Sequence, residues 1–170
     1  MNNKFKEIHP QDAIAENVFN KIGKQWMLIT AKSEERVNTM TASWGTLGVL
    51  WGKPVAICYI RPQRYTFPIV EESDSLSLSF LGEEYRSALR LCGSLSGRDV
   101  NKFEASGLTL AEDNGTPYVY ESETVLICKK LYADLLKKEA FTSDEPLSHY
   151  PDDDFHKFYI CEIEKILIKK

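Results

Sequence analysis

The sequence predicts a mainly β fold, a β-barrel with helices inserted between its strands. Short runs rich in β-branched and aromatic residues recur along the chain, and Gly, Pro, Ser or Asp separates them. The runs do not alternate strictly with helical segments, as the strands of a parallel βαβ sheet would. The last two runs are long enough to bend around a barrel.

Composition bounds the size and the class of the protein. With 170 residues, 43% of them hydrophobic, the chain can form one well-buried core, so we expect a single domain over residues 1–170. The 21 basic and 25 acidic residues give a net charge of -4 without a basic block, which argues against nucleic acid as a partner. No run is long enough to cross a bilayer, and the first twelve residues have no apolar signal core. We therefore expect a soluble, cytoplasmic protein with no membrane partner.

The first half of the chain predicts one helix followed by strands. Residues 11–20 place Ala13, Ile14, Val18 and Phe19 near helical spacing, so a short amphipathic helix is expected before Gly23. Strands are expected next at residues 26–32, 37–45, 54–61 and 75–81. Between them, residues 65–73 and 83–93 have the pattern of short helices or helical turns.

The second half returns to extended structure. Strands are expected at residues 116–120, 124–138 and 155–170. Asp113-Asn114-Gly115 predicts a tight turn before the first of these strands.

Most motifs of catalysis and metal binding are missing. The glycines near residue 48 do not fit a dinucleotide fingerprint, and HExxH and GxSxG do not occur. The acidic run at residues 151–154 is interpreted as a solvated turn rather than a metal site. No catalytic side chain and no metal site are therefore predicted. Buried reduced thiols are expected at the four separated cysteines, Cys58, Cys92, Cys128 and Cys161.

Three stretches combine small residues, hydroxyls and one large group: residues 38–45 (NTMTASWG), 61–66 (RPQRYT) and 96–103 (SGRDVNKF). Small residues let a ligand approach the backbone, and hydroxyls can bond the polar edge of a planar heterocycle. In the second stretch, two arginines next to a tyrosine and a threonine can form a cradle for an anion. Two alternatives stay open: an ordinary strand at 38–45, and a solvated loop in which Arg61 pairs with a local acid such as Glu71.

These stretches, in this order, resemble the flavin reductase-like family and especially its flavoredoxin-like members. The resemblance runs from about residue 26 to the final strand and includes CGSLSGRDVNKFEASGLT at residues 92–109. It implies an FMN-binding split barrel with antiparallel Greek-key topology, usually a homodimer with the flavin near the subunit interface. The sequence departs from the family pattern at CGSLSGRD, where a threonine and a lysine would be expected around Ser-Leu.

The resemblance also implies a set of cofactor-binding residues. The isoalloxazine and ribityl parts of FMN would lie along Asn38, Met40, Thr41, Ala42, Ser43 and Trp44. The phosphate would be held at Arg61, Arg64, Tyr65 and Thr66. A loop that closes over the flavin, or completes the partner's site, would contribute Ser96, Gly97, Arg98 and Lys102.

The activity that the resemblance implies is that of an FMN-dependent oxidoreductase. NADH or NADPH would reduce the flavin, and the flavin would pass the electrons to an acceptor. The alternative is a non-catalytic FMN-binding module that receives electrons from an electron-transfer protein. A barrel with a haem or another phosphorylated cofactor is disfavoured, because His156 is the lone candidate for an axial ligand.

Overall fold

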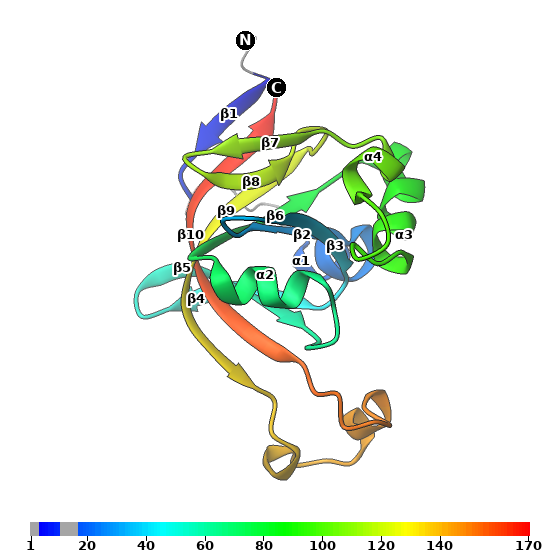
Figure 1. Cartoon of the computed structure of the whole chain (residues 1–170). Coiled ribbons are helices and arrows are strands. Elements are labelled where there is room, and N and C mark those ends of the chain that lie inside the picture. Colours follow the sequence, from blue (N-terminus) through cyan, green and yellow to red (C-terminus); the bar gives the residue numbers. More distant parts are fainter. Residues whose placement is uncertain (1–3, 11–16) are drawn as a thin grey trace.

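The computed structural model describes residues 4–10 and 17–170 and has a large antiparallel sheet at its centre (Figure 1). Seven strands follow one another in the spatial order β3-β2-β6-β9-β10-β5-β4, and an eighth, β1, pairs with β10. β7 (Leu110–Asp113) and β8 (Thr116–Val119) form a separate hairpin. The strands of the large sheet are β1 (Phe5–Ile8), β2 (Met27–Lys32), β3 (Val37–Ala42), β4 (Gly45–Leu50), β5 (Lys53–Ile60), β6 (Ser75–Phe80), β9 (Thr124–Leu135) and β10 (Lys157–Lys169).

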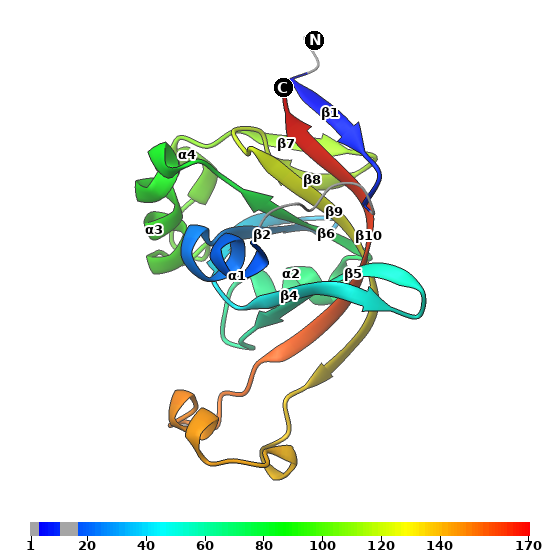
Figure 2. The same ribbon diagram turned by 180° about the vertical axis from the view of Figure 1, so that it is seen from behind.

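Short helices cover parts of this sheet. α3 and α4 lie together at one edge in Figure 1, and α1 is on the side seen in Figure 2. Within the described residues, no helix is long and apolar enough to cross a membrane. The helical segments are α1 (Val18–Asn20), the π-helical turn η2 (Lys21–Gln25), α2 (Thr66–Glu72), η3 (Glu83–Tyr85), α3 (Arg86–Ser94), α4 (Lys102–Ser106), η4 (Lys138–Ala140) and η5 (Glu145–His149).

β2 is buried on both faces because it lies between two apolar clusters. Met27 and Ile29 pack into the larger cluster inside the barrel, together with Phe80. Leu28, on the opposite face, packs in the cluster that contains Leu89 of α3. Each such aliphatic side chain contributes about 1.5–3 kcal/mol when it leaves water. The strand therefore fixes α3 against the barrel, and α3 in turn leads into one of the predicted ligand-binding stretches.

The predicted mainly β, antiparallel fold is confirmed, but several elements differ from the expectation. The strand expected at 37–45 ends at Ala42, and a separate strand, β4, begins at Gly45. β4 and β5 are joined by a tight turn in which Trp51 (φ 53°) and Gly52 (φ 70°) both have positive φ, as in a type I′ hairpin. The short elements β1 and α4 were not predicted. Of the helix expected at 11–20, residues 11–16 lie outside the described residues, and Val18–Asn20 is helical.

The C-terminal end of α2 is anchored to two long strands. The Tyr159 hydroxyl donates to Glu71 Oε1 at 2.7 Å, and Lys157 Nζ lies 2.6 Å from Glu71 Oε2. Lys130 Nζ donates to the carbonyl of Val70, in the last turn of α2. Because α2 has only 7 residues, these contacts also fix its first residues, which belong to the RPQRYT stretch.

A projection between β9 and β10 extends beyond the barrel (Figure 1). Leu136 N donates to the carbonyl of His156 at 2.9 Å, so the two strands stay paired up to the base of this projection. Tyr150 and Phe155 stack inside it with ring centroids 4.8 Å apart, and Phe141 contacts both. Residues 137–155 thus have a small aromatic core of their own.

Candidate functional site

Two adjoining hollows bring together all of the predicted site residues except Asn38. The basic hollow, about 370 Å³, lies between the start of α2 and the loop after α3. The middle hollow, about 170 Å³, lies between β3 and the end of β5. Met40, Thr41 and Arg64 line both hollows. Also in the basic hollow are Tyr65, Thr66, Ser96, Gly97, Arg98 and Lys102, and also in the middle hollow are Ala42, Ser43, Trp44 and Arg61.

The basic hollow collects cations without any acidic side chain in its lining. Lys102 is buried and donates to the carbonyl of Cys92 at 2.6 Å. Burial lowers the pKa of Lys102, and the nearby charge of Arg64 lowers it further, although Cys92 opposes this effect. Arg98 donates to the carbonyl of Gln63 at 3.3 Å, with its guanidinium 5.5 Å from the Tyr65 ring. Such a cluster favours an anionic ligand.

Arg64 is exposed, and no acceptor for its guanidinium is found in the part of the chain that the structure describes. The guanidinium of Arg64 is therefore available to bind a ligand at the boundary between the two hollows. Arg64 is one of the two arginines that the sequence predicts in the anion cradle.

Asn38 supports the wall of the basic hollow from behind. Its side-chain amide donates to Thr66 Oγ1 at 2.8 Å, and it lines a neighbouring hollow that also contains Tyr65 and Gly97. A Cβ at Gly97 would lie 2.5 Å from Tyr65 Cδ1 and 2.6 Å from Asn38 Oδ1. The loop approaches this wall so closely that only glycine fits at residue 97.

Arg61 pairs with Asp154, not with the Glu71 considered in the alternative interpretation of the sequence. Its guanidinium bonds Asp154 Oδ2 and donates to the carbonyl of His149 at 2.8 Å. Gln63 adds a hydrogen bond of 2.7 Å to the same carboxylate oxygen. The acidic run at 151–154 is therefore not simply a solvated turn, because Asp154 ties the projection to the end of β5.

Trp44 and His156 form the far wall of the middle hollow. The Trp44 ring lies 5.0 Å from that of His156 and 5.2 Å from that of His149. His156 is buried, and its Nδ1 shares a hydrogen bond of 2.9 Å with the Tyr150 hydroxyl. Burial, together with the charges of Arg61 and Arg64, lowers the pKa of His156 to about 4, against the opposing effect of Asp154. The imidazole is thus neutral at pH 7.

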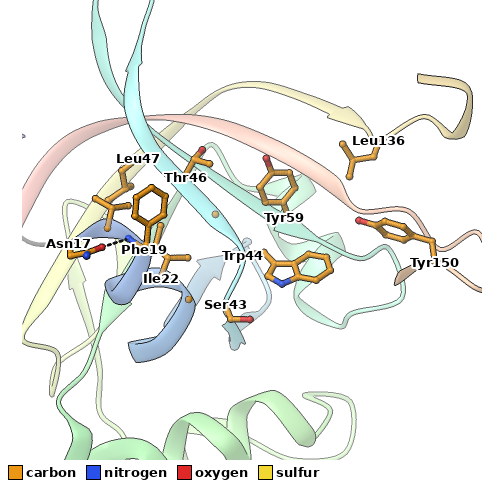
Figure 3. Close-up of a pocket in the computed structure, with 13 residues that line it drawn as sticks. Asn17, Phe19, Ile22, Ser43, Trp44, Thr46, Leu47, Tyr59, Leu136 and Tyr150 are labelled. Carbon is orange, nitrogen blue, oxygen red and sulfur yellow. Dashed lines mark hydrogen bonds between the residues drawn. The ribbon is translucent and has the colours of Figure 1, made fainter. Parts of the chain in front are cut away.

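Beyond Trp44 the middle hollow meets a much larger apolar pocket of about 1070 Å³ (Figure 3). Ser43, Trp44 and Tyr59 line both. Phe19, Leu47 and other residues of α1, η2 and β4 form the remaining walls, with Leu136 and Tyr150 at the end near the projection. The three hollows therefore lie in a row. Their lining residues change along the row from basic, through a mixture of charged and neutral groups, to uncharged.

The sequence interpretation missed Gln63, Tyr59, Tyr150 and Asp154. Gln63 lies inside a stretch that was singled out, so its position in RPQRYT was a usable signal. Tyr150 and Asp154 reach the site only through contacts with residues about 90 positions earlier, such as the Arg61–Asp154 pair. No local pattern indicates such contacts.

The cysteines are buried thiols, and the acidic groups of the described residues do not gather into a metal site. All four thiols are free and buried, as expected, and burial raises the pKa of Cys92. Among residues 4–10 and 17–170, no group of three or more His, Cys, Asp or Glu side chains is placed to hold a metal ion.

Comparison with known proteins identifies similar sequences and folds. The model of the "Flavin reductase like domain" family matches residues 19–169. No curated protein sequence matches the chain significantly.

Three solved structures illustrate the likeness of fold. An FMN-binding domain of a flavin reductases-like enzyme from Shewanella baltica aligns with TM-score 0.70 and 19% identity, over 99% of this chain and 79% of that one. An FMN-binding protein from Thermus thermophilus with bound p-hydroxybenzaldehyde aligns with TM-score 0.68 and 19% identity, over 93% and 79%. Flavoredoxin from Methanosarcina acetivorans aligns with TM-score 0.67 and 18% identity, over 93% and 77%. At these identities the comparison establishes the fold, which is the split-barrel type.

The depressed pKa of His156 predicts a specific pH dependence of stability. The unfolded chain takes up a proton near pH 6.5, whereas the folded chain does so only near pH 4. The contribution of His156 to the free energy of unfolding is therefore constant above pH 6.5. As the pH drops from 6.5 towards 4, this contribution is lost and the free energy of unfolding falls. Between pH 7 and pH 5 this residue should cost about 2 kcal/mol of stability.

Urea unfolding of the wild type and of His156→Gln at both pH values measures this effect. The glutamine amide can still bond Tyr150 but does not titrate, so its variant should lack this part of the loss. An NMR titration in which the His156 imidazole gains its proton near pH 6.5 would contradict the prediction.

Proposed function

The chain belongs to the flavin reductase-like domain family, and from this premise we propose that it is an FMN-binding oxidoreductase. The observation that carries the proposal is the row of three hollows, whose character changes from cationic to mixed to uncharged. FMN changes in the same order along its length, from a phosphate through a hydroxylated chain to a flat aromatic ring. The residues present therefore fit FMN in one orientation only, with its phosphate in the basic hollow and its ring towards the apolar pocket.

The phosphate would be held in the basic hollow. Arg64 offers an unpaired fork, and Arg98 and Lys102 add positive charge from the opposite loop. Thr66 Oγ1 accepts a hydrogen bond from Asn38, which leaves the Thr66 hydroxyl proton free to donate to a phosphate oxygen. Asn38 is thus assigned a positioning role, and so is Arg61, because its guanidinium already bonds Asp154 and His149.

The ribityl chain and the ring would follow β3 towards Trp44. Met40, Thr41, Ala42 and Ser43 line this path with small or flexible groups that permit close approach. Bound FMN supplies the redox chemistry, accepting a hydride equivalent and releasing electrons in one or two steps. The protein itself binds the phosphate, orients the ring and keeps His156 neutral beside it, so no side chain needs to act as acid or base.

NADH or NADPH is the proposed electron donor. The competing proposal is an FMN-binding module that exchanges electrons with a protein partner, and the likeness to a flavoredoxin favours keeping it. The two proposals agree on the cofactor and differ only in the donor.

Rapid mixing of the FMN-loaded protein with NADH or NADPH separates them. The enzyme proposal predicts that the flavin absorbance bleaches within the first turnovers with at least one of the two nucleotides. If neither bleaches the flavin, while dithionite does, the electron-transfer module is the better account.

Arg64 should decide the preference for FMN over riboflavin. Hydrogen bonds to charged groups are worth about 1.5–3 kcal/mol, so Arg64→Ala should weaken FMN binding by about ten- to a hundred-fold. Riboflavin lacks the phosphate, so its affinity should stay nearly unchanged. Titration of both flavins into the apo protein measures the two constants.

Arg90→Ala is the matched control for that experiment, since Arg90 is an exposed arginine of α3 outside both hollows. It should leave both affinities within about twofold. Equal losses of FMN and riboflavin in Arg64→Ala would mean that the arginine supports the fold instead.

A homodimer is part of the proposal. Leu50 and Trp51 at the tip of the β4–β5 hairpin and Val49 beside them are exposed, a concentration of apolar surface that favours association. Tyr118 is buried against Phe5 and does not contribute. Light scattering of the FMN-loaded protein should give about twice 19.4 kDa. A stable mass of 19.4 kDa at micromolar concentration would refute the dimer.

A further inference from the structure

We infer that Glu71 and Tyr159 are positioning residues for the phosphate of FMN, although they meet at the end of α2 that is remote from the ligand. The inference rests on the proposed function and deepens it. It assigns part of the preference for FMN over riboflavin to a hydrogen-bond network whose members do not line the basic hollow.

α2 connects this network to the ligand. Tyr65, which precedes its first residue, and Thr66 line the basic hollow, and Glu71 lies in its last turn. At about 1.5 Å per residue, the 7 residues of α2 span only about 10 Å. Over so short a distance a helix moves as one rigid body, so a shift at Glu71 also displaces the Thr66 hydroxyl.

Apolar packing alone does not fix α2 in every direction. Ile69 and Val70 are fully buried and hold the helix against the core of the barrel. The hydrophobic effect is not directional, so this packing sets the depth of the helix more strictly than its position along its own axis. The first turn receives the hydrogen bond between Asn38 and Thr66, but Tyr65 provides no side-chain cap. Directional contacts at the other end are therefore needed to set the position along the axis.

The hydrogen bonds of Glu71 supply this direction. Tyr159 is fully buried, and its hydroxyl donates to Glu71 Oε1 at 2.7 Å, while Lys157 Nζ lies 2.6 Å from Glu71 Oε2. Burial raises the pKa of Glu71, but the hydrogen bonds from Lys157 and Tyr159 outweigh it, so the pKa is lower than usual and the carboxylate is charged at pH 7. Burial and the hydrogen bond to Glu71 raise the pKa of Tyr159, so its hydroxyl keeps its proton. Hydrogen bonds to a charged group are shorter and stronger than neutral ones.

Glu72, the next residue of α2, does not share this role. It pairs with Arg36 at 2.6 Å, but its side chain is exposed. Exposed ion pairs contribute little to holding a structure in place. The two adjacent glutamates therefore differ in their effect on the ligand, and this difference provides the control.

Tyr159→Phe tests the inference, because it removes the hydroxyl and keeps the ring in the core. Titration of the apo protein should show FMN binding weakened by about three- to tenfold and riboflavin binding unchanged within about twofold. The ³¹P resonance of bound FMN should shift, since the phosphate meets a displaced Thr66 hydroxyl.

Substitutions of Glu71 give a second, independent test that also applies if Tyr159→Phe does not fold. Glu71→Ala should weaken FMN binding alone, by about three- to tenfold. Glu71→Gln should restore part of the FMN affinity, because its amide oxygen still accepts from Tyr159. Glu72→Gln is the matched control and should leave both affinities within about twofold of the wild type and the ³¹P resonance in place.

The outcomes separate the inference from the proposed function. If Arg64→Ala weakens FMN binding but Tyr159→Phe and Glu71→Ala do not, the inference is overturned and the proposed function stands. Equal losses of FMN and riboflavin in Tyr159→Phe or Glu71→Ala also overturn the inference, because the network then supports only the fold. If the wild type does not bind FMN, both are overturned.

Discussion

The contact between Arg61 and Asp154 fastens the projection after β9 to the end of a barrel strand, next to the ladder pair of Ile60 and Lys157. Both side chains are half-buried, and the carboxylate also accepts from Gln63. Removing either partner would leave the other charge without its counter-charge. Arg61 also donates to the carbonyl of His149, so the pair helps to hold His149, Tyr150 and His156 near Trp44. It thereby supports the walls of the middle hollow and part of the apolar pocket.

Two arginines of one short stretch have different surroundings and therefore different proposed roles. The guanidinium of Arg61 already bonds acceptors of the protein itself. Arg64, three residues later, faces the hollows and has no acceptor among the described residues. In the proposed function the first shapes the site and the second binds the ligand. Residue type alone does not distinguish these roles, because they follow from which acceptors the fold brings near each guanidinium.

The sequence predicted what local patterns encode. β2, β5, β6 and the last two strands have continuous or alternating apolar residues, and their positions were foreseen. β4 was not, because GTLGVL has two glycines, no clear alternation and largely exposed side chains. The RPQRYT and SGRDVNKF stretches were singled out from their residue types and from a family resemblance, and they do lie together across the basic hollow. The alternative pairing of Arg61 with a local acid such as Glu71 was wrong, since the acid that Arg61 bonds lies 93 residues away and only tertiary structure selects it.

Trp44, Ser43 and Tyr59 belong at once to the middle hollow and to the apolar pocket. A ligand in either cavity therefore touches the same side chains, and any shift of the indole on filling one changes the shape of the other. Affinities measured separately for the two cavities are then not independent quantities. Thermodynamic reciprocity requires that whatever factor the first occupant imposes on the second is imposed equally in return. A single indole wall thus makes the two cavities one coupled binding system.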